Sequence, residues 1–149
     1  MTGKKLISNL KYYLTPSVNT TIYLSDRNAE KELPCVVLGY DSEEGSIQGI
    51  QGHYTVSGYA RVEFQGYEDP SNLSADNISN QVVDALSNKT LLLSVMNKPA
   101  ASSTTTDSRP LSGFGLNAIL IRGITREDEG TSTCIVINFD AYCAACDFS

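Results

Sequence analysis

The stretch HYTVSGYARVEFQ, residues 53–65, alternates apolar and polar positions over its whole length. Successive side chains of a β-strand point to opposite faces of its sheet, so this alternation predicts a long strand with one buried face. The buried face would carry Tyr54, Val56, Gly58, Ala60, Val62 and Phe64. The polar face would carry Thr55, Ser57, Tyr59, Arg61, Glu63 and Gln65. A strand of this length is normally central, so the rest of the chain is expected to be organised around it.

The residues before this strand predict one helix and two further strands. Apolar residues recur at helical spacing over residues 4–14, and Pro16 ends this amphipathic helix because the residue before a proline is pushed out of the helical region. Residues 20–25 and 33–40 have the composition of strands, separated by a charged loop. Pro34 is tolerable only at the start of the second strand or on an edge. The acidic, glycine-rich residues 41–52 predict a flexible connection.

The residues after the long strand predict a second helix and a hairpin. Ser74 can cap a helix that runs to Leu86, with Asp76 in its first turn. Residues 91–96 either extend this helix or form a short strand, and periodicity does not decide between the two. Apolar, β-branched strands over residues 114–125 and 131–142 enclose a charged turn. The chain thus predicts a single α+β domain, residues 1–149, with a mixed or antiparallel sheet of about five strands packed against two helices.

Two segments lie outside this core. Residues 97–112 are rich in Ser and Thr and almost without apolar residues, so they cannot offset their ordering entropy unaided and are expected to form a flexible loop. Residues 143–149 are expected to form a cysteine-containing C-terminal tail. Cys143 and Cys146 should then be dispensable for folding, because exposed chain ends contribute little to a core.

The charge balance limits the possible partners. Lys and Arg number 11 against 17 Asp and Glu, a formal net charge of −6. Nucleic-acid binding that is independent of base sequence needs a basic stripe, so this balance argues against a nucleic-acid binder, although DNA could slide through an acidic pore without sticking. The sequence has no run of about 18 apolar residues and no signal-peptide core, so no membrane partner is expected and the protein should be made in a cytoplasm.

The sequence carries no motif that supports an enzyme. His53 is the only histidine, and a Ser-His-acid hydrolase would need it, but no Gly-x-Ser-x-Gly elbow is present. Residues 113–118, GFGLNA, superficially match the dinucleotide fingerprint, which requires a strand before it and a helix after it. Here a loop precedes and a strand follows. We therefore expect no catalytic residues and no cofactor.

The four cysteines are the remaining candidates for chemistry. Cys143 and Cys146 have the two-residue spacing that lets two thiols reach one metal or form a redox disulfide, and Cys35 and Cys134 would complete a tetrahedral zinc site. A redox pair of this kind normally opens a helix, whereas this pair lies close to the end of the chain. Ordinary thiols in a reducing cytoplasm are the simpler interpretation.

The order and spacing of the elements resemble those of a known family. An amphipathic N-terminal helix and a charged loop precede LPCVV, residues 33–37, and the long alternating strand 54–64 leads through a turn to the helix 78–86 and a closing strand pair. This arrangement resembles the tail-terminator, or tail-completion, proteins of tailed bacteriophages over residues 4–142.

The resemblance implies a structural virion protein, made in the host cytoplasm and located at the tail neck. Such a protein forms a ring, usually a homo-hexamer, on the head-proximal end of the tail tube, where it stops polymerisation of the tube protein and docks a neck or head-completion protein. DNA would pass through the lumen without specific binding. The interface candidates are Tyr59, Arg61 and Glu63 on the polar strand face and Thr104, Thr105 and Thr106 in the loop. The alternatives are another neck or head-closure connector and, in a different class, a small thiol or zinc protein.

Overall fold

The computed structural model describes residues 2–25, 34–48, 51–65, 74–96, 116–129 and 132–144. Its elements are α1 (Thr2–Leu14), β1 (Thr21–Leu24), β2 (Cys35–Gln48), β3 (Gln51–Gln65), α2 (Ser74–Ser87), α3 (Lys89–Met96), β4 (Leu116–Glu129) and β5 (Ser132–Ala144). The charged loop 26–32 and the Ser/Thr-rich loop 97–112 of the sequence prediction lie outside the described residues.

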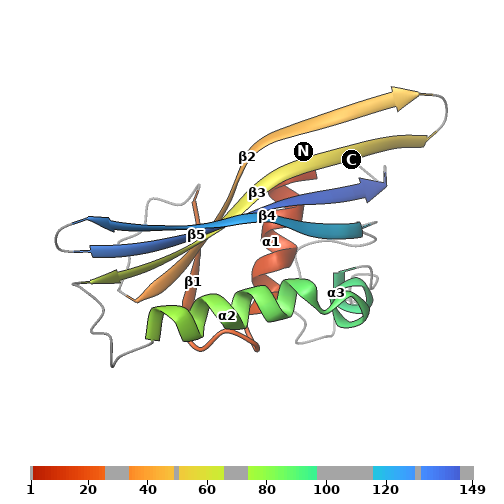
Figure 1. The fold of residues 1–149 in the computed structure, drawn as a ribbon. Helices are drawn as coiled ribbons and strands as arrows, with labels where there is room; N and C mark the ends of the chain where they lie inside the picture. Colours follow the sequence, from red (N-terminus) through yellow and green to blue (C-terminus); the bar gives the residue numbers. More distant parts are fainter. Residues whose placement is uncertain are drawn as a thin grey trace.

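The strands form one five-stranded sheet in the order β1-β2-β3-β5-β4. β1 runs parallel to β2, and the β2–β3, β3–β5 and β5–β4 pairs are antiparallel. All three helices lie on one side of this mixed sheet (Figure 1). The predicted α+β single domain is therefore confirmed, and β3 is central as its length predicts.

The apolar positions of the alternating pattern in β3 are the positions that face the core. Val56, Ala60 and Val62 are fully buried, and Phe64 packs against the same core. The helices close this core through apolar stripes at helical spacing, which are Leu6, Ile7, Leu10 and Leu14 in α1 and Ile78, Val82, Ala85 and Leu86 in α2. The Tyr13 hydroxyl ties α1 to α2 by donating to the Ala85 carbonyl oxygen at 2.5 Å.

The helical segment 91–96 is a separate helix, so the sheet packs against three helices where two were predicted. The break between α2 and α3 falls at Asn88, whose side-chain Oδ1 accepts a hydrogen bond from the Leu91 N–H at 3.3 Å. Asparagine competes for backbone donors in this way and favours helix starts over helix interiors. Leu92 and Met96 are buried, which anchors α3 to the core.

The prediction of a flexible connection over residues 41–52 is wrong for residues 41–48 and 51–52, which are strand, and residues 49–50 lie outside the described residues. β2 continues to Gln48 and pairs with β3 down to Gln51, so the two strands form a long hairpin that rises away from the helices (Figure 1). Asp, Glu, Gly and Ser have low intrinsic strand preference, but strand formation depends on the neighbouring strand, and β3 supplies a pairing partner for each of residues 42–48. A β-bulge at Asp41 interrupts the pairing once.

Two further boundaries differ from the prediction. Residues 126–129 of the expected turn belong to β4, which pairs with β5 as far as Glu129. Cys143, expected in the C-terminal tail, lies in β5 and is buried in the core, and residues 145–149 lie outside the described residues. The premise that Cys143 is an exposed chain-end residue is therefore wrong. No helix in the described ranges is long and apolar enough to cross a membrane.

Candidate interaction surface

The side of the sheet that faces away from the helices, here called the open face, carries the sequence-predicted interface residues of β3. Tyr59, Arg61 and Glu63 alternate with the core residues Ala60 and Val62, so they project together onto this face. Thr104, Thr105 and Thr106, the candidates from the loop, lie outside the described residues.

The three β3 side chains form a contiguous group. The Arg61 guanidinium carbon lies 5.7 Å from the centroid of the Tyr59 ring, and its NH1 lies 3.7 Å from Oε1 of Glu63. The Cys35 thiol lies 3.7 Å from the other carboxylate oxygen of Glu63, at hydrogen-bonding distance for sulfur. Arg61 is thus held between an aromatic ring and a carboxylate, and half-exposed cation–π contacts of this kind are worth about 0.5–1 kcal/mol.

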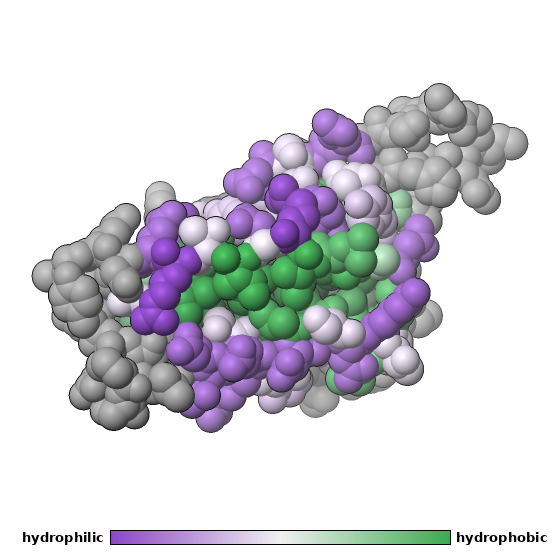
Figure 2. Space-filling model, in the orientation of Figure 1, coloured by the Kyte–Doolittle hydropathy of each residue, from purple (hydrophilic) through white to green (hydrophobic). Residues whose placement is uncertain are grey.

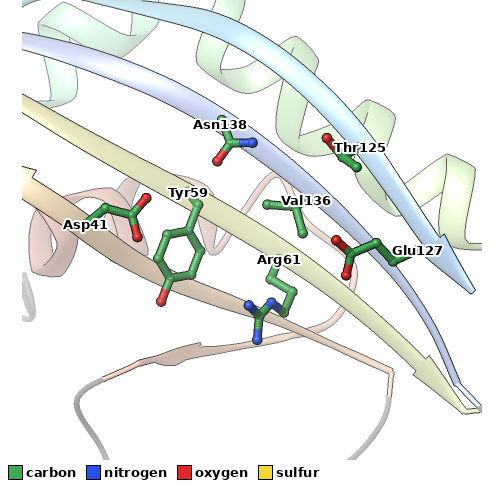
Figure 3. A pocket seen from close by; sticks show the side chains of 7 residues that line it. All are labelled: Asp41, Tyr59, Arg61, Thr125, Glu127, Val136 and Asn138. Atoms are coloured by element: carbon green, nitrogen blue, oxygen red, sulfur yellow. The ribbon is translucent and has the colours of Figure 1, made fainter. Parts of the chain in front are cut away.

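Neighbouring strands complete an open pocket around this group. The pocket has a volume of about 300 Å³ and is lined by Asp41 from β2, Tyr59 and Arg61 from β3, Val136 and Asn138 from β5, and Thr125 and Glu127 from β4. Figure 3 shows these side chains on the same side of four adjacent strands. The pocket combines one cationic group, two carboxylates, an amide and an aromatic hydroxyl, which suits polar contact with another molecule.

Close packing orients the Tyr59 ring. A Cβ added to Gly39, its cross-strand partner in β2, would lie 2.4 Å from the Tyr59 hydroxyl and 2.6 Å from Oγ of Ser25. The missing side chain of Gly39 therefore makes room for the ring to lie flat across β2.

A second polar group lies farther along the same face. Asp140 accepts a hydrogen bond from the Ser57 hydroxyl at 2.9 Å and pairs with the Arg122 guanidinium, whose Nε lies 3.0 Å from the same oxygen. These contacts join β3, β5 and β4.

Sequence reasoning found only the β3 part of this surface. Asp41 fell in the predicted connection, and Glu127 fell in the predicted turn. Asn138 and Asp140 lie in a strand that was predicted from its apolar, β-branched residues. Their alternation with Ile137, Phe139 and Ala141 was the signal that could have placed them on the polar face.

The cysteines do not gather at one site. Cys134 and Cys143 lie at opposite ends of β5, and Cys143 packs in the core with Leu116. Cys35 and Cys134 flank Glu63 on either side in the strand pairing. Cys146 and the side chain of His53 are outside the described residues. Within the described ranges, no group of three or more His, Cys, Asp or Glu residues could hold a metal ion.

Comparisons with known proteins give a match of fold. No protein-family model and no curated protein matches the sequence. Among solved structures, the chain is similar to one in the virion of a native gene transfer agent particle, with a TM-score of 0.56, 12% sequence identity and coverage of 96% of each chain. At this identity the similarity shows that the two chains share a fold over nearly their whole lengths.

Proposed function

We propose that this protein is a structural component of a phage-like virion, and that it forms a ring at the head-proximal end of a tail tube. The ring would stop polymerisation of the tube protein and present a docking face to a neck or head-completion protein. The observation that carries this proposal is the fold shared with a virion chain over 96% of both chains. The element order that resembles tail terminators supports the same role.

The open face suits this role better than catalysis. Its described side chains form short hydrogen bonds and ion pairs among themselves across β3, β5 and β4, as at Asp140. Such a surface offers polar contacts to a neighbouring subunit, and polar and aromatic groups are common in protein interfaces. The net charge of −6 fits a lumen through which DNA passes without specific binding.

The thiol or zinc protein is the rival from a different class. A four-cysteine zinc site needs all its ligands within about 2.3 Å of one ion. Cys134 and Cys143 cannot satisfy this distance from opposite ends of β5. Another neck connector remains the rival from the same class, and the test below separates it from a tube cap.

Negative-stain images of the purified protein, with and without assembled tail tubes, test the proposal. We expect rings, either in the pure protein or on one end of the tubes, and tubes of limited length when the protein is present during polymerisation. Rings that bind only to the head connector would support the neck alternative. A protein that forms no ring and leaves the tubes uncapped would overturn the proposal. Stoichiometric zinc in a monomer would favour the thiol or zinc protein instead.

A further inference from the structure

We propose that copies of this chain join head to tail, with the β4 edge of one copy against the outer part of β2, Asp41 to Gln48, of the next. This inference rests on the proposed function, because a ring requires one contact between two different surfaces that repeats around an axis. It specifies which surfaces those are.

The first surface is the outer edge of β4. β4 ends the strand order, and its only strand partner in the described part of the chain is β5. Leu120 projects from it into solvent with 57% of its surface exposed, at the level of Ser42 in β2. Figure 2 shows apolar residues in a band along β4 and the adjoining part of α2, bordered by polar residues. A long edge strand with exposed apolar residues is a template for pairing with another chain.

The second surface is the outer edge of β2. β1 pairs with β2 only from Cys35 to Leu38, so the rest of β2 has β3 as its only strand partner among the described residues. This outer part carries the exposed carboxylates Asp41 and Glu44. Glu43 points to the other side of the sheet, where its Oε2 accepts a hydrogen bond from the Gly3 N–H of α1 at 2.5 Å.

A pair of oppositely charged bulge residues lies at the same level on the two edges. Asp41 is inserted where Gly58 and Ser57 follow each other in β3. Arg122 is inserted where Phe139 and Asn138 follow each other in β5, and Phe139 is the cross-strand partner of Gly58. Bulges re-aim side chains at sheet edges. Two copies placed side by side without a shift along the strands would therefore bring Arg122 of one to Asp41 of the next.

The direction of the strands and the number of sheet edges left unpaired both favour this arrangement over a symmetric dimer. β2 and β4 run antiparallel to each other, since three successive antiparallel pairings separate them. A copy added by rotation about the ring axis therefore continues the antiparallel order of the sheet. Two β4 edges paired about a two-fold axis would leave both outer β2 edges open, whereas a closed head-to-tail ring covers the outer part of β2 and the part of β4 level with it in every copy.

Disulfide trapping tests the contact directly. Proteins carrying Asp41→Cys or Arg122→Cys are mixed, oxidised and separated on a non-reducing gel, and the same mixture is imaged by negative stain. The wild type is treated in parallel because it has cysteines of its own. A disulfide requires the two Cβ atoms to lie within about 4.5 Å, so only direct neighbours are trapped. We expect a cross-linked dimer in the mixture and a ladder of larger species when both substitutions are in one chain.

The outcomes separate this inference from the proposed function. Rings without a mixed dimer above the wild-type background would overturn the β4–β2 contact and leave the ring intact. A dimer formed by Arg122→Cys alone would show that two β4 edges meet about a two-fold axis, which would overturn the β4–β2 contact. A mixed dimer without rings would support the contact and count against the ring.

Charge exchange provides an independent measurement. Asp41→Arg and Arg122→Asp should each raise the concentration at which assembly is half complete by about tenfold, and the double exchange should recover most of that loss. Asp84→Arg, the same charge reversal at an exposed position of α2 on the helix side of the sheet, is the matched control and should assemble like the wild type. Thermal melting checks that each variant is folded. Equal losses in the single and double variants would contradict the pairing.

Discussion

The ring of Phe139 lies directly over Gly58, its cross-strand neighbour on the core side of the sheet. A Cβ built on Gly58 would lie 2.7 Å from the tip of that ring, and Phe139 is completely buried. One strand further, the Tyr59 ring lies over Gly39 on the open face. Adjacent strands thus hold one aromatic ring against each face of the sheet, and in both cases a glycine makes the approach possible.

Gly58→Ala should destabilise the fold by about 1–3 kcal/mol, because the added methyl group overpacks a core that cannot shift freely. Urea unfolding measures the loss. Gly123→Ala is the matched control, since a Cβ there meets no heavy atom within 4 Å, and its stability should stay within about 0.5 kcal/mol of the wild type. Equal stability of the two variants would show that Phe139 does not depend on the space above Gly58.

Gly39→Ala should affect the open face more than the core. The new methyl group would displace the Tyr59 ring and with it the Arg61 side chain that lies over the ring. We expect lower ring assembly at a modest cost in stability. Tyr59→Ala should produce a similar assembly defect without overpacking, and sedimentation of both variants measures it. If Gly39→Ala assembles normally while Tyr59→Ala does not, the position of the Tyr59 side chain does not depend on the glycine at position 39.

Stability should fall in alkaline solution because of Tyr13. Burial raises the pKa of Tyr13 above its ordinary value of 10.0. A group whose pKa is higher in the folded state contributes its full stability below the unfolded pKa and loses it as the pH rises through the folded pKa. Unfolding free energy should therefore decline above about pH 10.

Tyr13→Phe is the matched variant for this effect. It removes the hydrogen bond to the Ala85 carbonyl oxygen, so it should cost about 1 kcal/mol near neutral pH and show a smaller alkaline decline than the wild type. Urea titrations at several pH values compare the two proteins. Parallel declines would assign the alkaline loss to other groups.

Cys143→Ser should destabilise the protein by about 1–2 kcal/mol, because it places a hydroxyl in a buried apolar environment. Cys134→Ser, at a half-buried position on the open face, should cost less. This expectation reverses the one drawn from sequence, where Cys143 was assigned to an exposed tail. Thermal melting of the two variants in reducing buffer decides between the two views.

Local periodicity was sufficient to predict much of the fold. The alternation around Ala60, the helical stripe around Leu10 and the β4–β5 hairpin each lie within one continuous segment whose own pattern reports its buried face. The residues 41–48 could not be assigned this way, because their strand form depends on pairing with β3 and not on their own preference.

The candidate surface was harder to predict for the same reason. Tyr59, Arg61 and Glu63 were found because they share one strand, but Asp41, Glu127 and Asn138 join them only through the strand order and register. Asp41 and Arg122 lie at the same height along the strands only because of two bulges and three strand pairings. None of these is a local property of the sequence.

Arg61→Ala gives the sharpest test of the open face. The side chain is nearly half exposed, and surface ion pairs contribute little to stability, so the loss in unfolding free energy should stay below about 1 kcal/mol. Its contacts with Tyr59 and Glu63 order the centre of the pocket, and we therefore expect a clear loss of ring assembly or of tube capping in negative-stain images.

Asn80→Ala, at an exposed position of α2 on the opposite side of the sheet, is the matched control and should assemble normally. Arg61→Lys should recover only part of the loss, because lysine keeps the charge but lacks the planar guanidinium that stacks on Tyr59. If Arg61→Ala folds and caps tubes as well as Asn80→Ala does, the open face takes no part in assembly, and the contacts must lie on the strand edges alone.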